Sequence, residues 1–215
     1  MKFFLKPVSW ISLLFLFACG GGSSLSDAEI INPITSPTPN DLPECNPSGY
    51  EKTLYCTYTR LGLDREFYVY VPDDIYSKTS NPPLLFNLHG YRRQAIDFLG
   101  YSGFQILADE DKFIVIHPQG SILPSSGEPH WNDTGWSSES PADDVDFISS
   151  LIDWGLTNYQ INPNRVYATG KSNGGKMSYH LACNLRYRIA GVASVGETMN
   201  PNTYSSCNPS HPTPI

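Results

Sequence analysis

The stretch that decides the fold is VYATGKSNG, residues 166–174. A β-forming run ends in the pentapeptide Gly170-Lys171-Ser172-Asn173-Gly174, and a helical pattern follows over 173–186. G-x-S-x-G between a strand and a helix is typical of a nucleophile elbow, in which a strained turn exposes the serine hydroxyl. The helix N-terminus then faces the developing negative charge. We therefore predict Ser172 as a nucleophile, with Gly170 and Gly174 letting the backbone pass close to its neighbours.

The same chemistry requires an oxyanion hole made of two backbone N–H groups. One comes from the residue after the nucleophile, here Asn173, and the other from the loop that follows an earlier strand. An apolar strand at 84–88 runs into His89-Gly90, so Tyr91 is the predicted second donor. His89 is interpreted as a structural residue that bonds across this loop. A phosphate-binding P-loop is excluded, because it requires a glycine where Arg165 stands.

The remaining pattern alternates short apolar strands with helices. We expect a hairpin at 53–59 and 66–71, strands at 84–88, 113–116, 165–168 and 189–195, and helices at 94–109, from 140 onward and at 173–186. Ser140 is the expected N-cap of the middle helix, with Pro141 in its first turn. Such alternation predicts an α/β fold with a mainly parallel sheet and helices on both faces.

The N-terminal residues have the composition of an export signal. Residues 1–18 combine Lys2 and Lys6 with a short apolar run, and LFAC at 16–19 is similar to a bacterial lipobox. We expect Cys19 to be lipidated, the segment 19–44 to be a flexible tether, and 45–215 to fold. Ordinary secretion with an unmodified Cys19 is the alternative. The net charge of −7 argues against nucleic acid or an anionic membrane surface as a partner, so the membrane contact is the lipid anchor alone.

Four further cysteines suit an oxidising compartment. They allow three pairings, of which Cys45–Cys56 and Cys183–Cys207 is the most economical because each bridge closes a local loop. The spacing CxxC is absent from the sequence, so we expect no zinc site and no other cofactor.

Several motifs together carry a family resemblance. They are REFYVYVP (65–72), LHGY (88–91), PQG (118–120), WND (131–133), DDVDFI (143–148), NRVYATG (164–170) and SNGGKM (172–177). In this order they resemble the feruloyl esterase / polyhydroxybutyrate depolymerase group of α/β-hydrolases. The resemblance implies an α/β-hydrolase fold and secreted serine esterase activity. Its implied substrates are hydroxycinnamoyl or acetyl esters on plant polysaccharide, or a short polyester. It also supports the Cys183–Cys207 bridge.

The catalytic acid and histidine are missing from the expected positions. In this fold the order is Ser, then Asp or Glu, then His, yet after Ser172 the sequence has no Asp, only Glu197, with histidines at 180 and 211. His180 lies too far along its helix to reach Ser172. In the family, the strand leading to the acid begins near Pro214-Ile215. We therefore expect a domain that is incomplete at its C-terminal end, an exposed sheet edge at 189–195, and a chain with little activity.

Some residues keep two interpretations. Glu197 is expected to be a rim residue, although it could replace the missing acid. Asp143, Asp144 and Asp146 are interpreted as capping and surface charge, with a binding role as the alternative. Trp131 and Trp136 are either packing residues or platforms for a substrate ring.

Two alternative functions also stay open. A peptidase of the prolyl-oligopeptidase kind shares the nucleophile elbow. A non-catalytic surface lipoprotein that binds polysaccharide would explain the missing acid and histidine.

Overall fold

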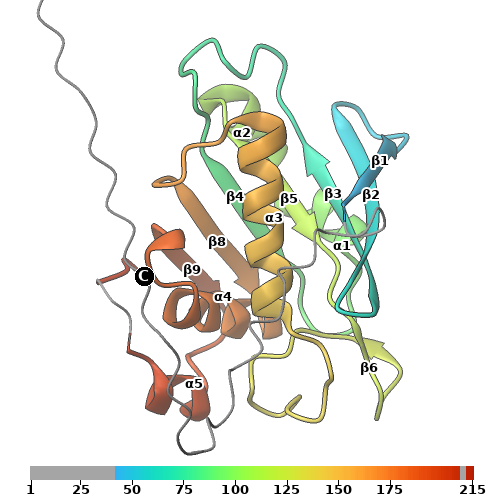
Figure 1. Cartoon of the computed structure of the whole chain (residues 1–215), viewed down its shortest axis with the longest axis vertical. Helices are drawn as coiled ribbons and strands as arrows, with labels where there is room; N and C mark the ends of the chain where they lie inside the picture. The colour runs from blue at the N-terminus through green and yellow to red at the C-terminus, as the bar shows by residue number, and fades with distance from the viewer. Residues whose placement is uncertain (1–41, 209–211) are drawn as a thin grey trace, which may run out of the picture. The chain divides into compact units, whose positions relative to one another are not determined.

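The computed structural model describes residues 42–208 and 212–215, which form a seven-stranded sheet with helices on both faces and a second sheet of two short strands (Figure 1). The signal segment, most of the tether, Cys19 and His211 lie outside the described residues. The strands are β1 (Glu44–Pro47), β2 (Thr53–Arg60), β3 (Leu63–Tyr70), β4 (Leu84–Leu88), β5 (Ile114–Pro118), β6 (Ile122–Leu123), β7 (Glu128–Pro129), β8 (Val166–Lys171) and β9 (Gly191–Val195). The helices are α1 (Ala95–Ser102), α2 (Phe104–Asp111), α3 (Asp144–Tyr159), α4 (Asn173–Asn184), a 3₁₀ turn at Arg186–Arg188 and α5 (Pro201–Ser206).

The main sheet has seven strands in the order β1-β2-β3-β5-β4-β8-β9. Strands β5, β4, β8 and β9 are parallel, while β1, β2 and β3 form an antiparallel meander that joins β5 through β3. The predicted hairpin and the α/β class are confirmed. Side chains of β4 and β5 are almost all buried, as expected for strands covered on both faces.

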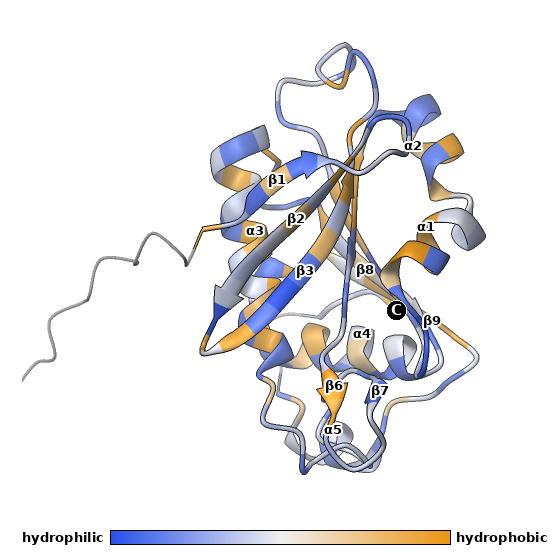
Figure 2. Cartoon of the chain, turned by 90° about the vertical axis from the view of Figure 1, so that its right-hand side faces the viewer, coloured by the Kyte–Doolittle hydropathy of each residue, from blue (hydrophilic) through white to orange (hydrophobic). Residues whose placement is uncertain are grey.

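Helices α3 and α4 lie on one face of the sheet, and α1 and α2 lie on the other (Figures 1 and 2). The core between the sheet and α3 includes Phe67, Phe86 and Phe147, each almost fully buried. Apolar residues of α3 recur at helical spacing, which places Phe147, Ile148 and Leu151 against the sheet. This packing fixes the strand ends from which the functional residues project.

The single helix predicted at 94–109 is two helices in the structure. The pattern over 94–109 predicted a continuous helix, but α1 and α2 are separated by Gly103, whose φ is +68°. Glycine adopts this left-handed conformation without a Cβ penalty and commonly ends helices. The apolar periodicity hid the break because both helices present apolar residues to the sheet.

The start of α3 also differs from the prediction. Asp143, not Ser140, is the N-cap, and its carboxylate accepts a hydrogen bond of 2.8 Å from the N–H of Asp146. The carbonyls of Ser140 and Ala142 instead accept hydrogen bonds from the side-chain amide of Asn132. These carbonyls are therefore bonded within the loop between β7 and α3 and do not begin a helix.

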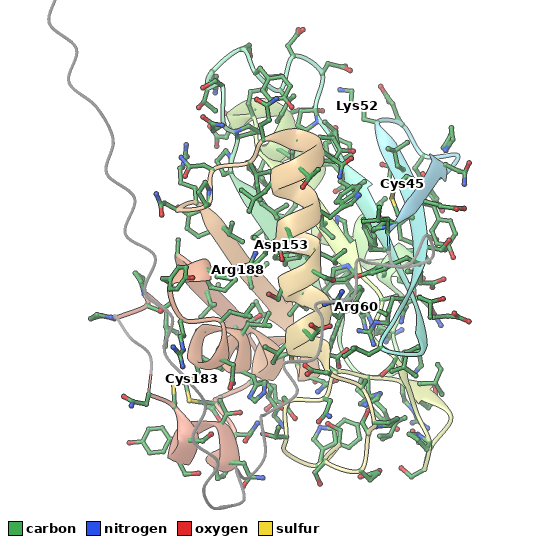
Figure 3. All side chains as sticks on the ribbon, viewed as in Figure 1. Cys45, Lys52, Arg60, Asp153, Cys183 and Arg188 are labelled. Atoms are coloured by element: carbon green, nitrogen blue, oxygen red, sulfur yellow. A yellow bond between two sulfur atoms is a disulfide. The ribbon has the colours of Figure 1, made fainter. Side chains whose placement is uncertain are left out.

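Both economical disulfides are present. Cys45 and Cys56 join β1 to β2, and Cys183 on α4 joins Cys207 just after α5 (Figure 3 labels Cys45 and Cys183). Closing loops of this length stabilises a fold by about 3 kcal/mol each in the chain-entropy model.

Strand β9 is the last strand of the sheet among the described residues. The carbonyl of Pro214 accepts a hydrogen bond of 3.0 Å from the N–H of Val192. The segment 212–215 therefore runs beside β9, where we expected a further strand to begin near Pro214-Ile215. Val195 at the end of β9 is 55% exposed.

In the described ranges, no helix is long and apolar enough to cross a membrane.

Candidate active site

Ser172 occupies the turn between β8 and α4 in a strained conformation. Its φ is +55° and its ψ is −123°, a region that residues other than glycine rarely adopt and that clusters at functional sites. The N–H of Ser172 donates to the carbonyl of Val195 (2.9 Å), and its carbonyl accepts from the N–H of Lys176 (3.0 Å). Two backbone hydrogen bonds thus hold the strained turn in place.

The two elbow glycines lie where other backbone segments pass close by. A Cβ on Gly174 would lie 2.5 Å from the carbonyl oxygen of His89 and would also overlap that of Leu88. A Cβ on Gly170 would overlap the carbonyl of Gly174. The end of β4 is therefore seated directly on the start of α4, which brings the loop after β4 to Ser172.

The loop after β4 supplies the second wall of the site. A Cβ on Gly90 would lie 3.6 Å from Cβ of Ser172, so Gly90 and Tyr91 adjoin the nucleophile. Asn173 is the first residue of α4, and the N–H of a first helical residue has no acceptor within its own helix. Its side chain is turned away, since the amide bonds the backbone N–H and carbonyl of Trp131 at 2.7 and 3.0 Å.

Ser172 opens into a cavity of about 470 Å³. Its other lining residues come from the loop after β4, from α1 and from the end of β8: Gly90, Tyr91, Arg93, Asp97, Phe98, Tyr101 and Lys171. The Lys171 ammonium lies 3.3 Å from the Tyr101 hydroxyl and 5.0 Å from the centre of that ring. Sequence reasoning missed the α1 residues, although a helix starting four residues after Tyr91 was a usable signal.

His89 is a structural residue, as interpreted from the sequence. It is fully buried, its Nδ1 bonds the carbonyl of Gly90 (2.8 Å), and its Nε2 accepts from the N–H of Gly120 (2.9 Å). Burial lowers the pKa of His89 to about 4, so the ring is neutral at pH 7. His89 therefore ties the Gly90 loop to the segment after β5. In that segment, the side-chain nitrogen of Gln119 also lies 3.1 Å from Nε2 of His89.

The buried histidines predict acid sensitivity of the fold. His117 on β5 is also fully buried and bonds Asn87 (3.2 Å), and burial lowers its pKa to about 3. An unfolded histidine titrates near pH 6.5, so below that pH the unfolded chain binds more protons than the folded one. The free energy of unfolding has its full value above about pH 6.5 and decreases as the pH falls. The contribution of His89 is lost down to about pH 4, and that of His117 down to about pH 3. Each contributes a slope of up to about 1.4 kcal/mol per pH unit.

Urea unfolding followed by tryptophan fluorescence at pH 7.5, 6.5, 5.5 and 5.0 checks this expectation. Most carboxylates remain ionised over that window, so histidines dominate the change. A free energy of unfolding that stays constant from pH 6.5 to 5.0 would contradict it.

The two tryptophans have different surroundings. Trp131 is fully buried, and its indole N–H donates to the carbonyl of His89 (2.8 Å). It is a packing residue. Trp136 is 44% exposed and packs edge-on against Tyr91, with ring centres 4.7 Å apart. The platform interpretation therefore remains only for Trp136.

The acidic residues at the start of α3 do not all lie on the surface, which corrects the sequence interpretation. Asp143 caps the helix, and Asp146 pairs with Arg60 at 2.7 Å (Figure 3 labels Arg60 beside α3). Asp144, however, is 1% exposed and forms a buried ion pair with Arg65, while its second oxygen accepts from the N–H of Asn132 (2.7 Å). The Asp144 carboxylate lies inside the fold because Arg65 on β3 points to the face of the sheet that α3 covers.

Neither Glu197, which could replace the missing acid, nor His180 is joined to Ser172 by a hydrogen bond or ion pair in the described part of the chain. Glu197 lies 3.5 Å from the Lys176 ammonium. His180 is buried, and its Nδ1 lies 2.9 Å from the hydroxyl of Thr203; burial lowers its pKa. Over residues 42–208 and 212–215, no histidine bonds the Ser172 hydroxyl, and no group of three or more His, Cys, Asp or Glu residues is arranged to hold a metal ion.

Comparisons with known proteins identify the fold and the class of the relatives. No protein-family model matches the chain. The bifunctional acetylxylan esterase/xylanase XynS20E of Neocallimastix patriciarum is 29% identical over 76% of this chain and 22% of its own length. Feruloyl esterase B of Thermothelomyces thermophilus is 29% identical over 54% and 38%. Poly(3-hydroxyalkanoate) depolymerase C of Paucimonas lemoignei is 30% identical over 54% and 28%. The chain thus spans well under half the length of these relatives.

Solved structures agree on the architecture. The acetyl xylan esterase from Aspergillus awamori superimposes with a TM-score of 0.50 at 22% identity, over 65% of this chain and 51% of its own. The S-formylglutathione hydrolase from Agrobacterium tumefaciens gives a TM-score of 0.52 at 17% identity, over 70% and 60%. The chain has the α/β-hydrolase fold, and its relatives in sequence are esterases.

Proposed function

We propose that this chain carries the nucleophile and the oxyanion hole of an exported serine carboxylic-ester hydrolase. The observation that supports this most directly is the strained Ser172, which opens into a cavity whose wall is the Gly90-Tyr91 loop. A serine held at positive φ between a strand and a helix N-terminus suits nucleophilic attack on an acyl carbon. The relatives act on esters by their names, acetylxylan and feruloyl esterases among them.

In this proposal the Ser172 hydroxyl oxygen attacks the ester carbonyl carbon and its proton passes to a base. The carbonyl oxygen becomes an oxyanion that the N–H groups of Tyr91 and Asn173 stabilise. Collapse of this intermediate releases the alcohol and leaves an acyl-serine, which water then hydrolyses to the acid. Removing one donor of an oxyanion hole typically costs about 10²–10³ in kcat.

The base and the acid are not assigned to residues of this sequence. Serine is a weak nucleophile without a histidine to take its proton, and within residues 42–208 and 212–215 no histidine bonds the Ser172 hydroxyl. We therefore expect the 215-residue chain to turn over esters slowly or not at all. The substrate class is a hydroxycinnamoyl or acetyl ester of plant polysaccharide, or a short polyester. Export and anchoring through Cys19 complete the proposal, and the two disulfides support an oxidising compartment.

A second candidate is a surface lipoprotein that binds polysaccharide without catalysis. The specific observation in its favour is that no histidine of the described residues bonds the Ser172 hydroxyl. The two functions differ in one property, the reactivity of the Ser172 hydroxyl.

Chemical rescue separates them. A fluorophosphonate probe is incubated with the chain with and without added imidazole, which can stand in for a missing histidine base, and the labelled residue is located by mass spectrometry. We expect labelling of Ser172 that imidazole accelerates by about 10²-fold, the lower end of general-base contributions. Ser172→Ala should remove the label, while Ser206→Ala on exposed α5 should leave it unchanged. Absence of any label with imidazole would favour the binding function.

A further inference from the structure

A second cavity lies apart from the nucleophile, at the turn end of the β2–β3 hairpin. Its volume is about 640 Å³, against about 470 Å³ for the cavity at Ser172, and the two share no lining residue. We call it the hairpin groove. Its lining includes Asp64, Arg65, Glu66, Gln94, Ser121 and Ile122.

The groove presents carboxylate oxygens that are held in place but not saturated. The Tyr55 hydroxyl donates to Oε2 of Glu66 (2.5 Å), and the Thr59 hydroxyl donates to Oδ1 of Asp64 (3.1 Å). The second oxygen of each carboxylate has no hydrogen-bond partner within the described ranges. Orientation by a neighbour with one oxygen left free suits a ligand that donates hydrogen bonds.

A buried hydroxyl points to the same kind of ligand. Ser121 lines the groove, and its Oγ is buried and has no hydrogen-bond partner among the residues that the structure describes. A buried polar atom without a partner is costly, and such atoms often mark the place of a ligand or an ordered water.

The charge of the groove restricts the ligand. Asp64 and Glu66 are acidic, and the one cation of the lining, Arg65, is paired with Asp144. An anionic ligand would be repelled. A polyester offers ester oxygens, which only accept hydrogen bonds, and would leave the carboxylates unpaired. A neutral chain rich in hydroxyl groups fits both constraints.

Aromatic rings continue the same face of the hairpin. The register pairs Tyr55 with Tyr68, Thr57 with Glu66 and Thr59 with Asp64, so all of these side chains share one face. The rings of Tyr55 and Tyr68 lie 5.0 Å apart and are half-buried. Aromatic faces next to carboxylates complement a sugar ring, which has apolar faces and a hydroxylated edge.

Two consecutive residues line the hairpin groove and the cavity at Ser172. Gln94 lines the groove and Arg93 lines the cavity at Ser172, and consecutive Cα atoms are about 3.8 Å apart. We propose that the hairpin groove binds the neutral polysaccharide chain whose ester substituent reaches Ser172. The link to the ester rests on the proposed function, whereas the binding of the glycan does not.

The test uses xylohexaose, a neutral oligosaccharide, titrated into the full chain by isothermal calorimetry and by NMR. We expect saturable binding that Glu66→Gln and Ile122→Ala each weaken by about tenfold, as removal of a charged acceptor or an apolar wall contact does. The controls are Glu110→Gln and Ile106→Ala on α2, which make the same changes at exposed residues outside the groove. They should bind as the unchanged chain does, and hexagalacturonate should bind at least about tenfold more weakly than xylohexaose.

Three outcomes would overturn the proposal: no binding of xylohexaose, equal binding by groove and control variants, or equal binding of the acidic oligosaccharide. Ser172→Ala separates this inference from the function. If that variant binds xylohexaose normally while Ser172 resists the fluorophosphonate probe with imidazole present, the groove stands and the esterase proposal fails. If Ser172 is labelled but the chain does not bind xylohexaose, the esterase proposal stands and the groove proposal fails.

Discussion

Replacing Asp144 by alanine is expected to lower the free energy of unfolding by about 3–5 kcal/mol. Asp144 is 1% exposed and Arg65 is 3% exposed, and they form an ion pair. The Arg65 guanidinium also lies over the Phe147 ring, 3.8 Å from its centre. Removing the carboxylate leaves a buried positive charge without a counter-ion and takes the acceptor from the N–H of Asn132.

A matched pair and a double substitution test the cause. Asp146→Ala removes the ion pair with Arg60, whose side chains are 29% and 33% exposed, and should cost about 1 kcal/mol or less. Combining Asp144→Leu with Arg65→Met removes both charges, and such replacements are often neutral or stabilising. Urea unfolding followed by tryptophan fluorescence measures all four proteins. If Asp144→Ala costs no more than Asp146→Ala, the pair is not buried as described.

Gly174→Ala is expected to destabilise the fold by about 3 kcal/mol, the upper part of the range for overpacking. The added methyl would meet the carbonyl oxygens of Leu88 and His89. Both belong to backbone at the end of β4, so neither can rotate away as a side chain would. The strand must shift, and the Gly90-Tyr91 loop shifts with it. We therefore also expect the labelling of Ser172 in imidazole to slow.

Gly100→Ala is the control for this substitution. Gly100 lies within α1, and a Cβ there would meet nothing within 4 Å. Alanine is favoured over glycine in helix interiors by up to about 1 kcal/mol, so this variant should be neutral or slightly stabilised. Thermal unfolding by circular dichroism compares the two. Equal melting temperatures for the two variants would refute the steric explanation.

Much of the fold was predictable because its signals are local. The apolar runs predicted β4, β5 and β8, and the placement of G-x-S-x-G predicted the turn at Ser172. The sequence left three disulfide pairings open, and the structure has the most economical one, in which each bridge closes a local loop. Each of these inferences rests on residues that are neighbours in sequence, which is where propensity and periodicity carry information.

The errors share a different cause. Ser140 has the side chain of an N-cap, but Asn132 holds the carbonyls around it, and the sequence gives no sign of that contact. Asp144 looked like a first-turn carboxylate, and only the fold brings Arg65 to it. The lining of the Ser172 cavity by Phe98 and Tyr101 depends in the same way on how α1 packs. Contacts between residues that are not neighbours in sequence decided all three.

The Asn173 amide has a consequence for how this scaffold can be altered. It forms hydrogen bonds with the backbone N–H and carbonyl of Trp131, and the Trp131 indole N–H donates to the carbonyl of His89. The elbow, the loop after β4 and the segment around Trp131 therefore behave as one mechanical unit. Insertions or exchanges meant to retune selectivity belong at the exposed tip between β6 and β7, residues 124–127. There the chain can be lengthened while the serine keeps its alignment.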